Sequence, residues 1–253
     1  MDAIGETVPA GRPVALGFEV AWLAPDGHTR TALADAVDVA FEGVAPVRTF
    51  PAYRGQQHCP GWYWAVSTDQ HIGYESWLER DHALLLDFDP AVAAFAAQPF
   101  WLSWRDGSSG RTRSHAPDFF ARLVDGSALV VDCRPQERID ERSAASFAAT
   151  GLACQAVGWS YRLVGAIEAV RAANLRWLAG YRHPRHGEGG GLVAAVAAAF
   201  AVPAPLFAQA ATVGDPIVVL PVVFHLLWRG VLGADLSQPL GDQSVVSGGW
   251  ARL

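Results

Sequence analysis

The sequence predicts an α/β protein, and three observations support this prediction. Segments with helical and strand-like periodicity alternate between Tyr74 and Leu178. Two strand-like segments in this stretch are separated by Asp125-Gly126, a pair that favours a β-hairpin. Apolar residues make up 51% of the 253 residues, which is enough to bury a sizeable core.

The N-terminal part predicts a small hairpin module over residues 1–45. Residues 14–23 read as a strand, Pro25-Asp26-Gly27 is typical of a turn, and a second short strand follows. Residues 46–72 are rich in aromatic residues and glycine, and their pattern fits either a loop or an irregular sheet.

The middle of the chain predicts the helices and strands of the α/β core. Ser76 and Glu79 have the Ser-x-x-Glu spacing of a capping box, so a helix starts there, and Asp89-Pro90 ends it. Gly158 is typical of the residue just after a helix. The remaining predicted elements are strands at 99–105, 118–124, 128–134 and 161–164 and helices at 139–158 and 169–178.

The C-terminal part predicts a smaller unit behind a linker. Residues 181–191 are basic and then glycine-rich, as in a linker. An alanine-rich helix, a helix around Phe207, the segment 216–228 and a short hairpin within 236–246 follow. Helices followed by a hairpin resemble a winged helix. We therefore divide the chain into residues 1–45, 46–186 and 187–253.

The charged residues limit the chemistry that the protein can perform. All 19 positive charges are arginine, so Schiff-base chemistry, a phosphate-loop lysine and a lysine general base are excluded. The net charge of −6 argues against a surface that coats nucleic acid as a whole. Residues 73–186 carry 13 of the arginines against 13 acids, so a polyanion is expected to bind there.

The cysteines and the apolar segments indicate where the protein resides. Cys59, Cys133 and Cys154 have no CxxC spacing, which predicts neither a disulfide framework nor a thiolate zinc site and favours the reducing cytoplasm. The first residues lack the apolar core of a secretory signal. The longest apolar run, 192–208, is interrupted by two prolines, so no membrane is expected as a partner.

A group of charged residues on the predicted hairpin is the candidate site. Asp132 and Arg134 are two apart on one strand and therefore share a face. Asp118, after Pro117, joins them only if the hairpin register is suitable.

The length of the hairpin loop decides that register. A two-residue loop would pair Val124 with Ser127 and turn Asp118 to the opposite face. A bulged three-residue loop, with Gly126 left-handed, would pair Val124 with Ala128 and place Asp118 opposite Arg134, one step from Asp132. We predict the bulged register.

The same residues predict a metal site. Asp118 and Asp132, beside Glu79 from the preceding helix, would repel one another unless a divalent cation neutralised them. Hard oxygen ligands favour Mg²⁺ or Mn²⁺, and such ions support phosphodiester hydrolysis by a metal-activated water.

Several segments resemble a known family. They are SWLERDHALLLDFDP, Gln98-Pro99, HAPDFF, ALVVDCR and VGWSYRLVG. In this order they resemble the TnsA-type endonuclease subunit of heteromeric transposases, a member of the restriction-endonuclease-like PD-(D/E)xK group. The resemblance covers roughly residues 46–185, and FHLLWRGVLGADLSQPL is similar in kind to the winged-helix-like second domain of that family.

The resemblance implies a fold and a function. The fold is a restriction-endonuclease-like mixed sheet flanked by helices, with a small, mainly helical, winged-helix-like C-terminal domain. The function is Mg²⁺-dependent cleavage of double-stranded DNA at the 5′ ends of a transposon. The implied partners are an integrase-type transposase, which joins the 3′ ends, and an AAA+ ATPase regulator.

The family's catalytic positions match particular residues of this chain. Glu79 occupies the position of the helical carboxylate, and Glu75, one turn earlier, is the alternative. Asp118 matches the central metal ligand, Asp132 the second strand ligand and Arg134 the motif lysine.

Arg134 is the departure from the family pattern. A guanidinium stays protonated, so it can clamp a phosphate but cannot take a proton from water. The alternative function is therefore a catalytically inactive DNA-binding or scaffold subunit that retains the fold, and a stand-alone nuclease in defence or repair is a third. In the plain structural interpretation, Glu79 only closes the capping box and Asp118, Asp132 and Arg134 are ordinary surface charges.

A second group of residues predicts contacts with the DNA backbone. Its members are cationic or potentially cationic: Arg171, Arg176, Arg182, Arg185 and His115. A solvated helix face followed by a linker explains the four arginines equally well.

Overall fold

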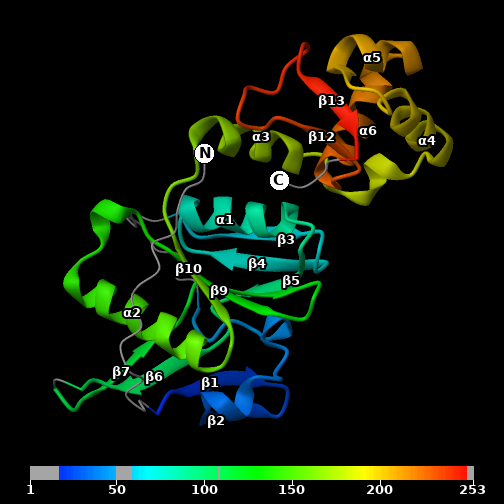
Figure 1. Ribbon diagram of the computed structural model, residues 1–253. Helices are drawn as coiled ribbons and strands as arrows, with labels where there is room; N and C mark the ends of the chain where they lie inside the picture. Colours follow the sequence, from blue (N-terminus) through cyan, green and yellow to red (C-terminus); the bar gives the residue numbers. More distant parts are fainter. Residues whose placement is uncertain (1–16, 50–58, 108, 250–253) are drawn as a thin grey trace.

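The chain folds as a mixed α/β protein around a four-stranded sheet (Figure 1). The computed structural model describes residues 17–49, 59–107 and 109–249. In spatial order the central sheet contains β10 (Ser160–Val164), β9 (Ala128–Cys133), β8 (Phe119–Leu123) and β5 (Val92–Ala97). β9 and β10 are parallel, and the other neighbours are antiparallel. The three strands predicted within 118–164 are confirmed.

Helices cover both faces of this sheet, and its inner strand β9 is therefore buried along its whole length. The two helices are α1 (Trp77–Phe88) and α2 (Glu141–Ala156), close to their predicted positions. Val131 packs in one cluster with Leu84 of α1, and Val130 packs in another with Ala153 of α2. The end of the sheet between these two helices is where the candidate site lies.

The predicted N-terminal hairpin is confirmed over its described residues, and it belongs to a second sheet. That sheet contains, in order, β2 (Gly27–Ala32), β1 (Glu19–Ala24), β6 (Trp101–Arg105) and β7 (Thr112–His115). Residues 14–16 of the predicted strand lie outside the described residues. Because β1 pairs with β6, the hairpin is hydrogen-bonded to the strand predicted at 99–105. The domain division at residue 45 stays a prediction.

The loop between β8 and β9 has the predicted three residues but begins at residue 124, one residue earlier than the predicted loop 125–127. It contains residues 124–126, with Gly126 left-handed at φ 86°. The Leu123 N–H donates to the Ser127 carbonyl at 2.9 Å and closes the loop. Asp125 causes this placement, since its carboxylate accepts both the N–H and the hydroxyl of Ser127.

The pairing of β8 with β9 is therefore shifted from the predicted register. Phe119 lies opposite Val131, so one step further Asp118 lies opposite Asp132 and not opposite Arg134. The predicted pairing of Val124 with Ala128 is wrong. The shift amounts to two residues, however, and side chains alternate with a period of two. Asp118 and Asp132 consequently remain on the same side of the hairpin.

The aromatic stretch whose structure the sequence left open contains a two-stranded hairpin. Its strands are β3 (Gly61–Ala65) and β4 (Gln70–Tyr74), and residues 50–58 lie outside the described residues. Buried side chains of this hairpin, such as Tyr63 and Ile72, belong to the same core cluster as those of α1.

The C-terminal unit has three helices and a three-stranded sheet. In chain order it contains α4 (Gly190–Ala199), β11 (Ala204–Pro205), α5 (Leu206–Val213), α6 (Pro216–Trp228), β12 (Leu232–Ala234) and β13 (Val245–Gly248). The sheet order is β11-β13-β12. The predicted helices are confirmed. The hairpin predicted within 236–246 is wrong in position, because β12 ends at Ala234 and the segment up to Ser244 connects the strands.

The segment 181–191 is more structured than a linker. It includes a 3₁₀ turn at Pro184–Gly187, and Gly190 and Gly191 already begin α4. The Tyr181 carbonyl is 2.8 Å from Nδ1 of the buried His225 in α6. This contact and the shared apolar core fix the segment against the C-terminal unit.

The helix α3 (Ala169–Ala179) connects the part of the chain that contains the central sheet to the C-terminal unit. Its buried Asn174 donates through the side-chain amide to the carbonyls of Leu236 and Gln238 and accepts from the Leu240 N–H. In Figure 1, α3 lies between α1 and the C-terminal unit.

In the part of the chain that the structure describes, no single helix has the length and apolar character of a membrane-spanning helix. The pair α5 and α6 meets that criterion only jointly, and the two helices are bent by 118° where they join.

Candidate active site

Two carboxylates face each other where β8 begins and β9 ends. Asp118 directly precedes β8, and Asp132 is the last residue but one of β9. The Cys133 N–H donates to Asp118 Oδ2 at 2.7 Å, and the Asp118 N–H donates to Asp132 Oδ1 at 3.3 Å. These reciprocal bonds to the backbone fix the two side chains side by side.

Asp132 is fully buried and is surrounded by donors. Its Oδ1 is 2.8 Å from Nε2 of His115 at the end of β7, and its Oδ2 accepts the Tyr161 hydroxyl of β10 at 2.8 Å. Burial and the charge of Asp132 raise the pKa of Tyr161, so this phenol stays a donor. Local sequence patterns did not point to Tyr161, because its partner is 29 residues away.

Glu79 enters the site from the first turn of α1. The Glu79 N–H donates to Ser76 Oγ at 3.2 Å, and the Glu79 carboxylate accepts the Ser76 hydroxyl and the Glu75 N–H, each at 2.7 Å. Ser76 thus caps the helix as predicted, while Glu79 returns bonds to the Ser76 hydroxyl and the Glu75 N–H instead of the Ser76 N–H. Burial raises the pKa of Glu79 despite these bonds. A capping role and a place in the acidic cluster are both compatible with this geometry.

Glu75 lies at the edge of the cluster and is paired with an arginine. Arg48 Nη2 is 2.9 Å from Glu75 Oε1 and 3.2 Å from Oε2. Arg48 is a second residue that sequence reasoning missed, since nothing in its local pattern pointed to Glu75.

The cluster holds more negative charge than its neighbours neutralise. Burial raises the pKa of Asp118 well above its usual value, and the negative charges of Asp132, Glu79 and Glu75 raise it further. Burial also raises the pKa of the Cys133 thiol, and the neighbouring carboxylates add to the effect. Such a cluster is expected to attract a cation.

The donor set suits Mg²⁺ in its chemistry, but its present arrangement offers few uncommitted oxygens. Both oxygens of Asp132 and of Glu79 already accept hydrogen bonds, whereas Asp118 Oδ1 has no donor among the described residues. Within those residues, no three His, Cys, Asp or Glu side chains are grouped as metal ligands. The predicted trio therefore shares one electrostatic environment without meeting at one point.

Arg134 lies apart from the four carboxylates. Its N–H donates to the Val164 carbonyl at 2.8 Å and extends the pairing of β9 with β10. Its exposed side chain donates through Nε to the Arg138 carbonyl at 3.3 Å. Hydrogen bonds from Ser143 lower the pKa of Asp140, and the charge of Arg134 adds to this effect. In this conformation the guanidinium is directed to the loop before α2.

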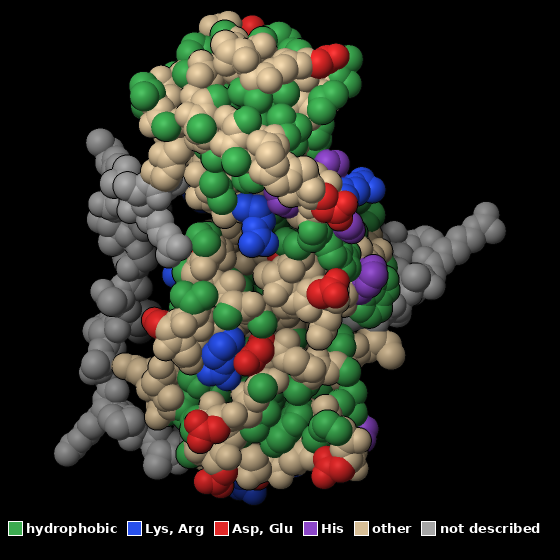
Figure 2. All heavy atoms as spheres, turned by 90° about the vertical axis from the view of Figure 1, so that its right-hand side faces the viewer, with side chains coloured by type: hydrophobic (Ala, Val, Ile, Leu, Met, Phe, Trp, Pro, Cys, Tyr) green, Lys and Arg blue, Asp and Glu red, His purple; other side chains and the backbone are tan. Residues whose placement is uncertain are grey.

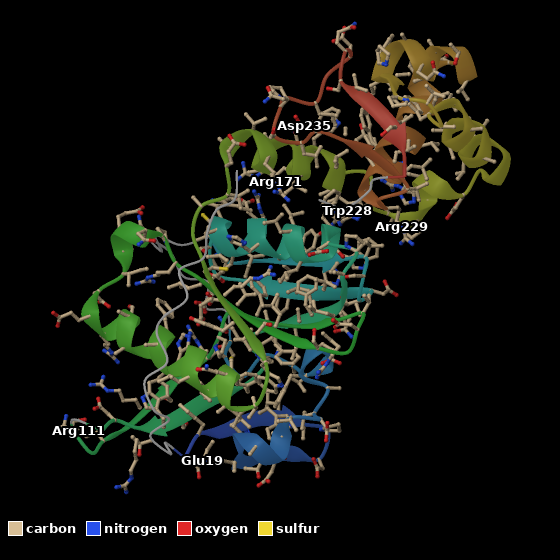
Figure 3. All side chains as sticks on the ribbon, viewed as in Figure 1. Glu19, Arg111, Arg171, Trp228, Arg229 and Asp235 are labelled. Atoms are coloured by element: carbon tan, nitrogen blue, oxygen red, sulfur yellow. The ribbon has the colours of Figure 1, made fainter. Side chains whose placement is uncertain are left out.

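The four arginines predicted to contact DNA have different surroundings. Arg182 stacks over Tyr63 and donates to the carbonyls of Trp64 and Ala179. Arg185 donates to His186. Arg171 is exposed on α3, where Figure 3 labels it. The guanidinium of Arg182 is thus already used inside the fold, which leaves it little capacity for phosphate.

Arg176 is likewise bound to a carboxylate of the fold. Its Nε and Nη2 donate to the two oxygens of Asp81 in α1, at 3.0 Å and 2.5 Å. Burial raises the pKa of Asp81, but the hydrogen bonds from Arg176 and Arg80 outweigh it and hold the pKa below the usual value. The pair joins α3 to α1.

We expect Arg176→Ala to lower the stability of the protein by about 1 kcal/mol without weakening DNA binding, since the pair is forked but half of the arginine is solvent-exposed. Because the folded pKa of Asp81 is depressed, the stabilisation is present above the ordinary carboxyl pKa and is lost as the pH falls through the folded value. Thermal melting at several pH values and DNA-binding titration measure both effects. Arg171→Ala, on the same helix, should leave stability unchanged; equal melting of the two variants would contradict the structural role.

Gln98 is a further residue that holds the site in place. It adopts a left-handed conformation with φ 45°, and its N–H donates to the Asp118 carbonyl at 2.9 Å. Its carbonyl accepts the Val47 N–H at 2.9 Å. The bend between β5 and β6 thus anchors the backbone of Asp118.

Comparison with protein-family models gives no match, and a search of curated proteins gives none either. The geometry of the site itself therefore carries the argument about function.

Proposed function

We propose that the protein is the metal-dependent DNA endonuclease subunit of a heteromeric transposase, which hydrolyses phosphodiester bonds at transposon 5′ ends. The observation that carries this proposal is the pairing of Asp118 with Asp132 across adjacent strands, next to Glu79 from the covering helix. Paired carboxylates whose charges are not neutralised by the protein are suited to a divalent cation and a phosphate.

The order of elements supports the restriction-endonuclease-like part of the proposal. Leaving out the β6–β7 excursion, α1 is followed by the antiparallel strands β5, β8 and β9, then by α2 and the parallel strand β10. The order of a helix, three strands, a helix and a strand agrees with the sequence, but the first of the three strands is β5, which was not predicted, because the strand predicted at 99–105 is β6 of the second sheet. In the C-terminal unit, the order α4, β11, α5, α6, β12, β13 with β13 in the middle of its sheet supports a winged-helix-like domain.

The residues divide the chemical tasks as follows. Asp118 would be the principal ligand, through its uncommitted Oδ1, and Asp132 and Glu79 would join it on release of hydrogen bonds that their oxygens now accept. Bound Mg²⁺ or Mn²⁺ supplies charge neutralisation and a water of lowered pKa. His115 and Tyr161 hold Asp132 in place. An integrase-type transposase and an AAA+ ATPase regulator are the proposed protein partners.

Arg134 favours the alternative function, a catalytically inactive DNA-binding or scaffold subunit. The observation is that its guanidinium bonds to the Arg138 carbonyl and contacts no carboxylate of the cluster. The active form of the proposal requires Arg134 to turn toward the scissile phosphate when DNA binds.

A nicking assay decides between the two. Wild-type protein with its partner subunits and end-containing DNA is expected to nick in Mg²⁺ or Mn²⁺ and to stop nicking in a chelator. Arg134→Ala should slow nicking about 10-fold to 100-fold, as expected for loss of a charged contact to phosphate. The matched control Arg138→Ala, an exposed arginine four residues later, should nick like wild type. No nicking by wild type, with partner binding intact, would favour the scaffold.

A further inference from the structure

The strand β7 is the exposed edge of the second sheet and leads directly into the candidate site. It pairs only with β6 among the described residues, and residues 111–114 are all exposed. Three residues after its end comes Asp118. Figure 3 labels Arg111 at the outer end of the β6–β7 hairpin.

The register of this hairpin aligns three basic side chains on one face. Arg113 lies opposite Trp104 and His115 lies opposite Leu102, and both partners are buried. The Asp106 N–H donates to the Arg111 carbonyl at 2.9 Å, so the same register continues to Arg111.

Arg111, Arg113 and His115 therefore follow one another at intervals of about 6.6 Å, the repeat of alternate residues on a strand. At the inner end of this row, His115 bonds to Asp132 of the carboxylate cluster. The row thus leads from the tip of the hairpin to the cluster. We call these three residues the β7 row.

The charges of the hairpin are only partly neutralised. Arg113 donates through Nε to Asp106 at 2.5 Å, yet 41% of its side-chain surface stays exposed. The Arg111 side chain makes no hydrogen bond or ion pair with the described residues, and only its backbone is bonded. Charges on an edge strand also hinder pairing with other sheets, but that role does not require them to point in a row toward the carboxylates.

A phosphate chain needs such cations to approach this site. The carboxylates of the cluster repel a polyanion, and the nearest guanidinium of the cluster, that of Arg48, is paired with Glu75. Arg182 is used within the fold, and Arg176 gives both Nε and Nη2 to the two oxygens of Asp81, whereas Arg113 gives only Nε to Asp106 among the described residues. The C-terminal unit offers little in their place: residues 187–253 carry 2 arginines against 4 acids. Its surface in Figure 2, at the top, is mostly apolar or uncharged.

We propose that Arg111 and Arg113 of the β7 row bind the phosphates of one DNA strand and lead that strand to the carboxylate cluster. Phosphates of one strand rise about 3.4 Å each along the helix axis and also wind around it, so adjacent phosphates are about 6–7 Å apart through space. The two guanidinium groups, about 6.6 Å apart, therefore match adjacent phosphates of one strand. The inference rests on the proposed function and specifies how its substrate is held.

The test is a DNA-binding titration of the full-length protein at several salt concentrations, with a labelled duplex of about 30 base pairs. Arg111→Ser/Arg113→Ser should weaken binding at least 10-fold and reduce the slope of log affinity against log salt by about 2, roughly 0.9 for each lost phosphate contact. Arg30→Ser/Arg229→Ser, which removes the same charge elsewhere, should keep the wild-type slope. Arg111→Ser alone, at an exposed position whose side chain makes no hydrogen bond or ion pair with the described residues, should give about half the change while melting like wild type.

Wild-type affinity and slope in the double variant would overturn the inference, even if the protein nicks DNA. Loss of binding in the double variant together with an absence of nicking by wild type would leave the inference standing and remove the proposed function. A double variant that nicks at the wild-type rate only when DNA is saturating supports both the inference about the β7 row and the proposed function.

Discussion

Asp118→Asn is expected to abolish nicking and, at the same time, to make the metal-free protein more stable at neutral pH. The amide oxygen still accepts the Cys133 N–H, but the repulsion from Asp132, Glu79 and Glu75 disappears. Loss of the principal metal ligand removes several kcal/mol of transition-state stabilisation, which corresponds to at least about 10³-fold in rate. Nicking rates and thermal melting without metal measure the two effects.

The pH dependence of stability gives a sharper form of this prediction. Burial and the neighbouring carboxylates raise the pKa of Asp118, so the folded protein holds a proton more readily than the unfolded chain. Stability must then fall as the pH rises from the ordinary carboxyl value through the raised pKa. Each unit of the raised pKa corresponds to about 1.4 kcal/mol, or at least about 2 °C in Tm for a chain of this size. Asn has no such proton, so the variant should lose this dependence.

Asp125→Asn is the matched control, at the loop end of the same hairpin. Hydrogen bonds from Ser127 lower the pKa of its exposed carboxyl, which is the opposite sign to Asp118. This variant should nick like wild type and gain no stability. An Asp118→Asn protein that melts below wild type at pH 8 would show that the cluster is not strained by its charge, and the argument for a cation there would fail.

The parts of the fold that the sequence predicted are those that local patterns determine. The capping box of Ser76 and Glu79, the glycine after α2 and the Gly126 turn each depend on residues within a few positions of one another. The register of β8 and β9 was missed by two residues because the Asx contact of Asp125 moved the loop. The side of the sheet on which Asp118 lies was still predicted correctly, since only an odd shift reverses it.

The parts that could not be predicted depend on contacts between distant segments. Tyr161 reaches Asp132 only because β10 pairs in parallel with β9, and Arg48 reaches Glu75 from a segment that had no clear pattern. Arg176 was predicted as a DNA contact from its residue type and position, and its forked bond to Asp81, a residue 95 positions away, could be found only in the structure. The sequence alone does not distinguish an arginine that binds a phosphate from one that binds a carboxylate of the same chain.

Asp132→Ala is expected to have the second large effect and to destabilise the protein by about 3 kcal/mol or more, because Asp132 accepts several hydrogen bonds. The His115 ring, the Tyr161 hydroxyl and the Asp118 N–H all lose a fully buried acceptor, and the two side chains are themselves at least partly buried. Each buried donor left without a partner costs about 1–3 kcal/mol, which outweighs the relief of repulsion with Asp118. Denaturant unfolding measures the loss, and a variant as stable as wild type would contradict it.

A strongly destabilised variant cannot by itself reveal whether Asp132 also serves the metal, and Tyr161→Phe separates the two roles. Removing one hydroxyl keeps the Asp132 carboxylate and should cost only about 1 kcal/mol of stability. If Asp132 is a ligand, the hydroxyl orients it, and Mg²⁺ affinity, measured by calorimetry without DNA, should fall about 10-fold. Unchanged or tighter Mg²⁺ binding would mean that Asp132 only positions His115 and the backbone of Asp118. In that case Asp118 and Glu79 would have to hold the cation without it.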